Sequence, residues 1–208
     1  MSEAKRELGI VGLGKMGANL ALQAMERGIR VAGTDRVAPS EELTGAGLVA
    51  LDGLGGFREA MSGPRAVFLY IPAGPAVDEL IGQLADELEE GDLIVDAGNS
   101  YWGDSIRRYH RLKEQGIQFV DLGTSGGVDG ARHGACFMAG GEPEAIARIE
   151  PILLDLATED GYVHAGLREP GTSRSSSTTG SSSGCSRPSG RAWTYSNITV
   201  TGSTSLRF

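Results

Sequence analysis

Six residues near the N-terminus constrain the fold more than any other part of the chain. Residues Gly12 to Gly17 form the pattern G-x-G-x-x-G, which follows a short apolar run and precedes apolar residues at helical spacing. Asp35 lies about 20 residues further along, where the next apolar run ends. The glycine pattern alone occurs often by chance, but a strand, a tight turn, a helix and this acidic residue together indicate a dinucleotide-binding unit.

The glycines and the helix that follows them have separate predicted roles. The first two glycines allow a tight turn and the close approach of a pyrophosphate, and the third lets the helix pack on the strand. Unpaired N–H groups at the helix N-terminus would receive the phosphates. The alternative is a glycine turn that holds no ligand. The residues that we expect to contact the cofactor are Gly12, Leu13, Gly14, Lys15, Met16, Gly17, Asp35, Arg36, Ile71 and Asn99.

Two of these residues bear on the choice of cofactor. Asp35 would accept hydrogen bonds from the ribose hydroxyls of the adenosine and would repel a 2'-phosphate, which favours NAD. Arg36 could pair with that phosphate and so admit NADP. Weighing Asp35 against Arg36, we expect the cofactor to be NAD.

Apolar runs and helical periodicities alternate along residues 8–156. Strands are predicted at 8–12, 29–32, 66–71, 93–95, 119–122 and 136–139, and helices at 16–25, 76–89, 105–114 and 145–156, with Pro151 as a kink or break in the last helix. The stretch after Arg36 contains glycine and proline and is predicted to be a loop. This alternation predicts an α/β fold, a doubly wound and mostly parallel sheet of the Rossmann NAD(P)-binding type.

Two polar segments follow the fourth and fifth predicted strands, where ligands of open α/β sheets bind. In the first, Asp96 to Ser100, Asn99 can donate and accept hydrogen bonds at once, which suits positioning a nicotinamide and a hydroxyl. An Asx turn or a helix cap explains this asparagine equally well. The second, residues 121–131, leaves backbone N–H groups unshielded beside two hydroxyls, a cradle for a carboxylate or phosphate. A plain flexible loop is the alternative for this segment.

These motifs resemble a known family. The fingerprint, Asp96 to Ser100, residues 121–131 and the run Met138-Ala139-Gly140-Gly141 occur in the order and spacing of the β-hydroxyacid dehydrogenases. Within that family, D-A-G-N-S and G-T-S-G-G-V-x-G resemble the decarboxylating 6-phosphogluconate dehydrogenases, particularly their shorter, NAD-preferring bacterial form. The resemblance covers residues 7–166.

The resemblance implies roles for residues that spacing alone does not assign. Ser125, Gly126 and Gly127 would contact a sugar acid, and Asn99 would bridge substrate and nicotinamide. The implied reaction, in the pentose phosphate pathway, oxidises the C3 hydroxyl of 6-phosphogluconate, releases CO2 and protonates an enediol to give ribulose 5-phosphate. Full-length members would form homo-oligomers. Two alternatives remain: a reductase of the 3-hydroxyisobutyrate or tartronate semialdehyde type, and a non-catalytic NAD-binding module.

Composition disfavours several other classes of function. A net charge of −8 argues against nucleic acid as a partner, because such binding requires a basic face. No apolar run approaches a bilayer span and the N-terminus lacks a secretory pattern, so we expect a cytoplasmic protein without a membrane partner. Neither the cysteines, Cys136 and Cys185, nor the histidines, His110, His133 and His164, have metal-ligand spacing, so we expect no metal site.

The composition changes near Gly166. Residues 1–166 carry 26 Asp and Glu against 14 Lys and Arg, whereas residues 167–208 carry one Glu, five Arg and no Lys, with 12 Ser and 7 Thr. This second segment shows neither a helical nor a strand period. We therefore expect a dinucleotide-binding domain over 1–166, and over 167–208 a low-complexity tail that is disordered or read out of frame.

The tail also stands where the family carries its acid–base pair. In the family a Lys and a Glu lie in a K-x-x-H-N-G-I-E segment that leads into an all-helical second domain, and this chain shows neither the segment nor that domain. If GC-rich codons for H-N-G-I-E-F-G-M are read one base late, they give T-T-G-S-S-S-G-C, which stands at Thr178 to Cys185. The same shift turns the lysine codon into Ser175 and the glutamate codon into Ser182. We therefore hypothesise a frameshift and expect this chain to turn over little or no substrate.

Overall fold

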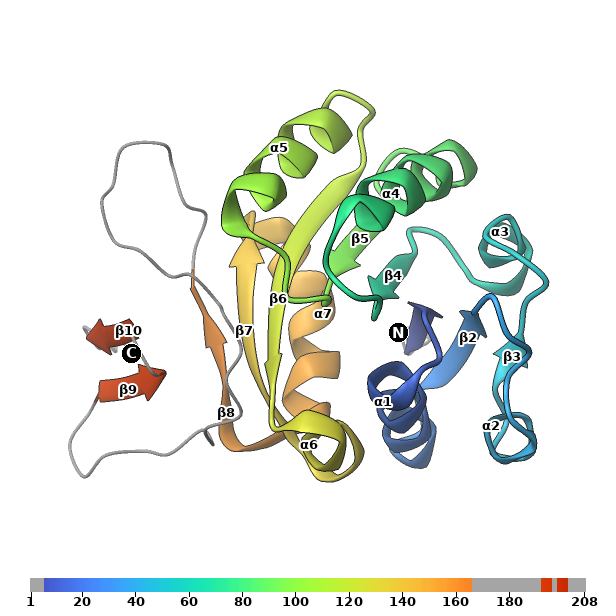
Figure 1. The fold of residues 1–208 in the computed structure, drawn as a ribbon, viewed down its shortest axis with the longest axis horizontal. Helices are drawn as coiled ribbons and strands as arrows, with labels where there is room; N and C mark the ends of the chain where they lie inside the picture. The colour runs from blue at the N-terminus through green and yellow to red at the C-terminus, as the bar shows by residue number, and fades with distance from the viewer. Residues whose placement is uncertain (1–5, 166–191, 196–197, 202–208) are drawn as a thin grey trace, which may run out of the picture.

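The structure, a computed structural model, describes residues 6–165, 192–195 and 198–201 (Figure 1). Eight strands form one sheet in the order β3-β2-β1-β4-β5-β6-β7-β8. The strands are β1 (Glu7–Val11), β2 (Arg30–Thr34), β3 (Val49–Ala50), β4 (Ala66–Leu69), β5 (Leu93–Asp96), β6 (Gln118–Ser125), β7 (Ala135–Gly141) and β8 (Ala157–His164). The helices are α1 (Lys15–Glu26), α2 (Glu41–Gly45), α3 (Gly56–Ala60), α4 (Pro75–Glu87), α5 (Trp102–Lys113), α6 (Gly127–His133) and α7 (Pro143–Leu156).

The sheet confirms the predicted α/β, doubly wound architecture. All pairings from β3 to β6 are parallel, whereas β7 runs antiparallel to β6 and β8 runs parallel to β7. The strand order reverses between β1 and β4, because the chain winds outward from β1 in one direction and from β4 in the other. In open α/β sheets, ligands bind beyond the carboxyl ends of the strands at such a reversal.

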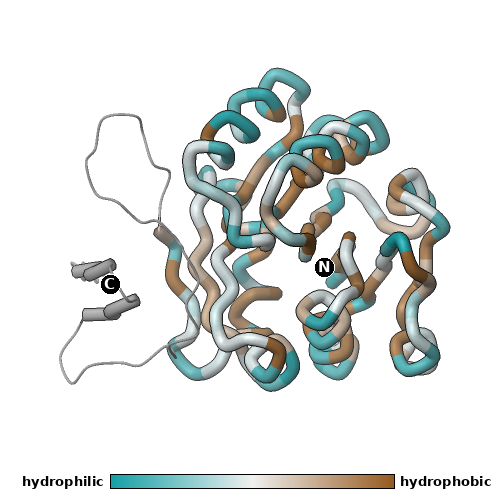
Figure 2. Tube along the Cα trace, in the orientation of Figure 1, coloured by the Kyte–Doolittle hydropathy of each residue, from teal (hydrophilic) through white to brown (hydrophobic). Residues whose placement is uncertain are grey.

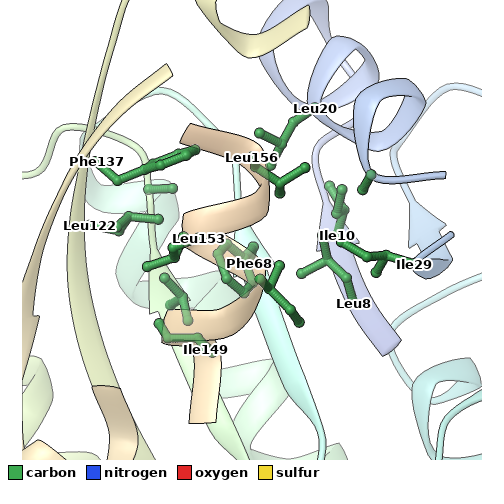
Figure 3. Packing of buried hydrophobic residues seen from close by; sticks show 14 of the residues in the cluster. Leu8, Ile10, Leu20, Ile29, Phe68, Leu122, Phe137, Ile149, Leu153 and Leu156 are labelled. Carbon is green, nitrogen blue, oxygen red and sulfur yellow. The ribbon is translucent and has the colours of Figure 1, made fainter. Parts of the chain in front are cut away.

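Helices cover both faces of the sheet, and each face has its own apolar core. On one face, side chains of α1 and α7 pack against the strands; Figure 3 shows Ile149, Leu153 and Leu156 of α7 among side chains of the sheet. On the other face, α3, α4 and α5 cover the sheet. In Figure 2 the outer turns of α4 and α5 are mostly hydrophilic and the strands beneath them mostly hydrophobic, as expected for helices with one buried side.

Several predicted boundaries were wrong. The stretch after Arg36 is not a simple loop, since it contains α2, β3 and α3. The segment 121–131 is not an open cradle throughout, because β6 continues to Ser125 and α6 begins at Gly127. Pro151 does not break α7, which runs on to Leu156. The strand predicted at 136–139 is present as β7, and β8 was not predicted.

Part of the serine- and threonine-rich segment also forms strands. β9 (Ala192–Tyr195) and β10 (Ile198–Thr201) pair antiparallel, which differs from the absence of strand periodicity that we expected. Aromatic and β-branched residues favour strands, and the serine-rich average of the tail hides this short run. The predictions for residues 167–191, including the hypothesised frameshift at Thr178 to Cys185, lie outside the described residues. Within the described part of the chain, no helix is long and apolar enough to cross a membrane.

Candidate cofactor and substrate site

The turn between β1 and α1 is closed by glycines that admit no side chain. A Cβ at Gly17 would lie 2.0 Å from the carbonyl oxygen of Gly12, so the third glycine is required for α1 to start against the strand. Gly12 has a φ of +95°, and a Cβ there would lie 2.5 Å from the carbonyl oxygen of Tyr70, which follows β4. These two glycines therefore serve the packing of the protein itself.

Gly14 differs from the other two. It has the allowed backbone angles φ −70° and ψ −166°, and a Cβ there would meet no atom of the described chain within 4 Å. The fold alone thus gives no reason for a glycine at this position. A ligand that approaches the backbone closely would give one, as a pyrophosphate does.

The N-terminus of α1 suits an anion. Gly14 is its N-cap, and among the described residues no side chain caps it and no acidic residue lies in its first turn. Its first N–H groups are therefore left for a partner, and the helix dipole favours a negative one. Lys15, the first residue of the helix, and Gly14 are exposed, whereas Leu13 and Met16 are partly buried. The residues of the predicted fingerprint thus fit a dinucleotide phosphate group.

Asp35 directly follows β2. Its Oδ2 accepts a hydrogen bond from the backbone N of Leu13 at 2.6 Å, and its Oδ1 accepts one from the backbone N of Arg36 at 2.6 Å. The carboxylate is therefore fixed against the glycine turn, and each oxygen keeps a lone pair for a further donor such as a ribose hydroxyl. The side chain of Arg36 is exposed, next to this carboxylate in the sequence.

The ends of β1, β4 and β5 meet at Ile71. The Cγ2 of Ile71 lies 3.0 Å from the Cβ that Gly12 lacks, and its carbonyl oxygen lies 2.3 Å from the Cβ that Gly98 lacks. Three predicted cofactor segments, distant in sequence, are thus brought together. Asn99, which follows Gly98, is exposed and has a φ of +60°. Among residues other than glycine, asparagine is one of the few that adopt this conformation readily.

Sequence reasoning missed the side chain that supports the Asn99 turn. Arg108 of α5 donates from Nη1 to the carboxylate of Asp96 and to the hydroxyl of Ser100, both at 2.8 Å. Arg108 is one of three arginines on α5, and nothing in the sequence separates it from Arg107 or Arg111. The turn is therefore fixed at both ends by one guanidinium.

The predicted sugar-acid residues lie where β6 passes into α6. Ser125 ends β6 and is buried, Gly126 is the N-cap of α6 with a φ of +115°, and Gly127 has a φ of +62°. Beyond Asp121 the strand extends past the end of β5 and pairs with β7 alone. The hydroxyl of Thr124 lies 3.3 Å from that of Tyr70, whose Cβ lies 3.2 Å from the Cβ position at Gly17. Tyr70 thus links the glycine turn to this second segment, a contact that the sequence did not indicate.

A second carboxyl group lies beside the Asn99 turn. Asp121 of β6 pairs in register with Asp96 of β5; Asp96 is fully buried and Asp121 is partly buried. Burial raises the pKa of Asp121 to about 6, and the negative charge of Asp96 acts in the same direction. The Ser105 hydroxyl and the Arg108 guanidinium oppose this rise. Asp121 is therefore a carboxyl group near the candidate site whose pKa lies close to neutral pH.

The histidines lie away from this site. His110 and His164 are exposed, and His133 is exposed with its Nδ1 3.0 Å from Asp129 Oδ1 in α6. Within residues 6–165 and the two short strands, no group of three or more His, Cys, Asp or Glu side chains could hold a metal ion. Cys136 is buried in β7, whereas Cys185 lies outside the described residues.

Comparisons with known proteins match the same part of the chain. Residues 7–166 match the family model described as the NAD binding domain of 6-phosphogluconate dehydrogenase. YqeC of Bacillus subtilis, named as a candidate 6-phosphogluconate dehydrogenase, is 44% identical over 161 residues, which cover 77% of this chain and 54% of that protein. The decarboxylating 6-phosphogluconate dehydrogenase 2 of Saccharomyces cerevisiae is 39% identical over 165 residues, covering 76% of this chain and 34% of that protein.

A solved structure shows the same fold. The 6-phosphogluconate dehydrogenase of Plasmodium falciparum was determined in its apo form, with its cofactor NADP+ and with its substrate 6-phosphogluconate. It is 31% identical to this chain, with a TM-score of 0.71, over 77% of this chain and 37% of that one. The chain therefore spans about half the length of the Bacillus relative and about a third of the yeast and Plasmodium relatives.

Proposed function

The chain belongs to the family of the NAD-binding domain of 6-phosphogluconate dehydrogenase, and on that premise we propose that it holds a nicotinamide dinucleotide for the oxidative decarboxylation of 6-phosphogluconate. The observation that carries this proposal is Gly14, where the fold leaves open space and uncapped N–H groups in place of a side chain. In an open α/β sheet, a dinucleotide held in this way lies at the reversal of strand order, where it can accept a hydride from a substrate.

In this proposal each segment of the site has one task. The N–H groups of α1 bind the pyrophosphate, and Asp35, fixed by Leu13, accepts hydrogen bonds from the adenosine ribose. Asn99 positions the nicotinamide and the C3 hydroxyl together, and Ser125 with the two glycines after it contacts the sugar acid. When bound, the cofactor supplies the acceptor for the hydride from C3 of the substrate. Loss of CO2 and protonation of the enediol then give ribulose 5-phosphate.

We assign NAD as the preferred cofactor from the charge at the end of β2. A 2'-phosphate on the adenosine ribose would stand against the Asp35 carboxylate, which two backbone N–H groups hold in place. The exposed Arg36 is the one residue of the pair that would attract this phosphate. Titration of the protein with NAD and with NADP tests the assignment, with tighter binding of NAD expected. Equal affinities, or tighter binding of NADP, would contradict it.

We also propose that the 208-residue chain turns over little substrate. The reaction requires a base for the hydroxyl and an acid for the enediol, each worth roughly 10² to 10⁴ in rate. In the family these are a Lys and a Glu soon after the position of Gly166, and residues 167–208 contain no Lys. The protein would then bind its cofactor without releasing CO2.

A binding titration tests the core of the proposal. Addition of NAD to the folded protein should quench or shift its tryptophan fluorescence and raise its melting temperature, because a ligand that binds the folded state alone stabilises it. If a demonstrably folded sample shows neither change up to millimolar NAD, the cofactor-binding function is wrong. Release of CO2 from 6-phosphogluconate by the in-frame protein would separate this activity from that of a hydroxyisobutyrate-type reductase.

A further inference from the structure

The guanidinium of Arg108 is buried, with 3% of its side chain exposed. A buried charge is tolerated only when its donors are paired. Nη1 donates to Asp96 Oδ2 and Ser100 Oγ, both at 2.8 Å. Nε and Nη2 donate to the two carboxylate oxygens of Asp78 in α4, at 2.9 and 3.3 Å. Arg108 therefore has two separate sets of partners, one in the turn after β5 and one in α4.

The partners in the turn stand on either side of Asn99. Asp96 is the last residue of β5 and is fully buried, and Ser100 is also buried. The Oδ1 of Asp96 accepts a further hydrogen bond from the backbone N of Gly98 at 3.0 Å. Asn99 lies between these anchored residues at a φ of +60°. This conformation is uncommon for residues with a Cβ, and although asparagine adopts it more readily than most, neighbouring contacts add to its stability.

We propose that Arg108 is a positioning residue, whose bridge between Asp96 and Ser100 holds Asn99 in the left-handed conformation that presents its amide to the nicotinamide. The inference rests on the proposed function for the role of Asn99. It goes further by assigning the conformation of the turn to a side chain on α5. The planar fork of an arginine suits this task, because it directs several donors to fixed positions at once.

The competing explanation is that Arg108 only joins α4 to α5 through Asp78. Two variants separate the roles. Arg108→Lys keeps the charge but replaces the fork by a single ammonium group, which cannot reproduce both bridges. Ser100→Ala removes one acceptor in the turn and leaves Arg108 with Asp96 and Asp78, so this variant should fold even if Arg108→Lys does not.

The neighbouring Arg107 provides a matched control. It also pairs with Asp78, at 2.9 Å, and with Asp104, at 2.9 Å, but it is exposed, and neither of these partners belongs to the Asn99 turn. Arg107→Lys therefore perturbs the surface pairing between α4 and α5 while the buried bridge to the turn remains.

The first readout compares two ligands of the full 208-residue protein. ADP-ribose lacks the nicotinamide, so the ratio of NAD to ADP-ribose affinity isolates the end of the cofactor that Asn99 would contact. We expect Arg108→Lys and Ser100→Ala to lower NAD affinity about fivefold, the equivalent of one hydrogen bond, while ADP-ribose affinity and the Arg107→Lys control stay unchanged. If NAD affinity is retained in both turn variants, or if both ligands weaken in parallel, Arg108 does not position Asn99.

The second readout does not depend on any ligand. The ¹³Cα and ¹³Cβ chemical shifts of Asn99 report its backbone conformation, and they should move away from left-handed values in Arg108→Lys and Ser100→Ala but not in Arg107→Lys. Unchanged shifts in the turn variants would overturn the inference. If the wild-type protein binds neither NAD nor ADP-ribose, the proposed function fails, and the Asn99 shifts alone then decide whether Arg108 holds the turn.

Discussion

Gly14 and Gly17 belong to one sequence pattern, yet their surroundings predict effects on stability of very different size for the same substitution. In Gly17→Ala the new Cβ would lie 2.0 Å from a backbone oxygen, so α1 must shift and stability should fall by about 2 kcal/mol or more. In Gly14→Ala the Cβ meets open space, so stability should change by less than about 1 kcal/mol, with the less favourable N-cap as the main cost.

For NAD affinity we expect the reverse: Gly14→Ala should weaken binding more than Gly17→Ala does in the molecules that fold. Gly14→Ala should weaken NAD binding at least tenfold, by about 1.4 kcal/mol or more, because the methyl group occupies the path of the pyrophosphate. Urea unfolding measures the stabilities and fluorescence titration the affinities. A Gly14→Ala protein that binds NAD as the wild type does would show that the open space is not the phosphate site.

The carboxyl group of Asp121 makes stability depend on pH. Its pKa is about 6 in the folded protein against 3.8 for an ordinary aspartate, so the folded state holds the proton more tightly than the unfolded state. This contribution to stability is complete below about pH 4 and is lost as pH rises to about 6, a difference of up to about 3 kcal/mol. Asp121→Asn removes the ionisation, so relative to the wild type its free energy of unfolding should rise between pH 4 and pH 7.

Urea unfolding of both proteins at several pH values measures this difference. Asp86→Asn, on the exposed side of α4, is the control for the loss of one acidic group from the chain. The difference between Asp121→Asn and the wild type must grow with pH, whereas a constant difference would mean that Asp121 titrates normally in the folded state.

At the scale of an element, α7 carries a proline in its interior. Pro151 is exposed, lacks the N–H that would bond to the preceding turn, and its ring crowds that turn. Pro151→Ala should therefore raise the free energy of unfolding by about 1 to 3 kcal/mol. Leu154→Ala, at another exposed position of the same helix, should change it by less than about 0.5 kcal/mol. No gain in Pro151→Ala would mean that the helix has adapted its geometry around the ring.

The sequence predicted the helices and strands that are long enough to show a recognisable pattern of apolar residues. α4 and α5 are long enough to show three turns of the pattern, β4 is a continuous apolar run, and β1 is apolar after its first residue, Glu7. α2 and α3 have five residues each, too few to display a helical period, and both lie in the stretch predicted to be a loop. The direction of β7 could not be predicted either, because strand direction depends on how the chain crosses the sheet and not on local periodicity.

The sequence predicted those residues of the candidate site whose type is determined by the backbone around them. Gly12 and Gly17 are required by close contacts, and Asp35 by its place after a strand, so each left a pattern in the sequence. Arg108 and Tyr70 left none, because their roles come from tertiary contacts between different elements of the fold. The sequence alone therefore identifies the residues that we propose contact the cofactor more readily than the residues that hold them in place.

For the whole molecule, the segment after Gly166 gives the most direct prediction. We expect that restoring one base near codons 166 to 168 yields a K-x-x-H-N-G-I-E segment and the helical domain that follows it in the family. The restored protein should release CO2 from 6-phosphogluconate with NAD, whereas the 208-residue chain should not. Sequencing the gene and assaying both proteins provide the measurement. A frame in which no single-base change produces this segment would rule out the frameshift.

The meeting of three strand ends at Ile71 also bears on how the protein is made. Gly12, Ile71 and Gly98 come from strands that are adjacent in the sheet but distant in the chain. A ribosome must therefore release the chain well beyond Gly98 before this junction can close, and local helix formation in α1 cannot complete it earlier. Retention on an immobilised nucleotide would then separate molecules with a finished sheet from partly folded ones, which makes the ligand a measure of folding during synthesis.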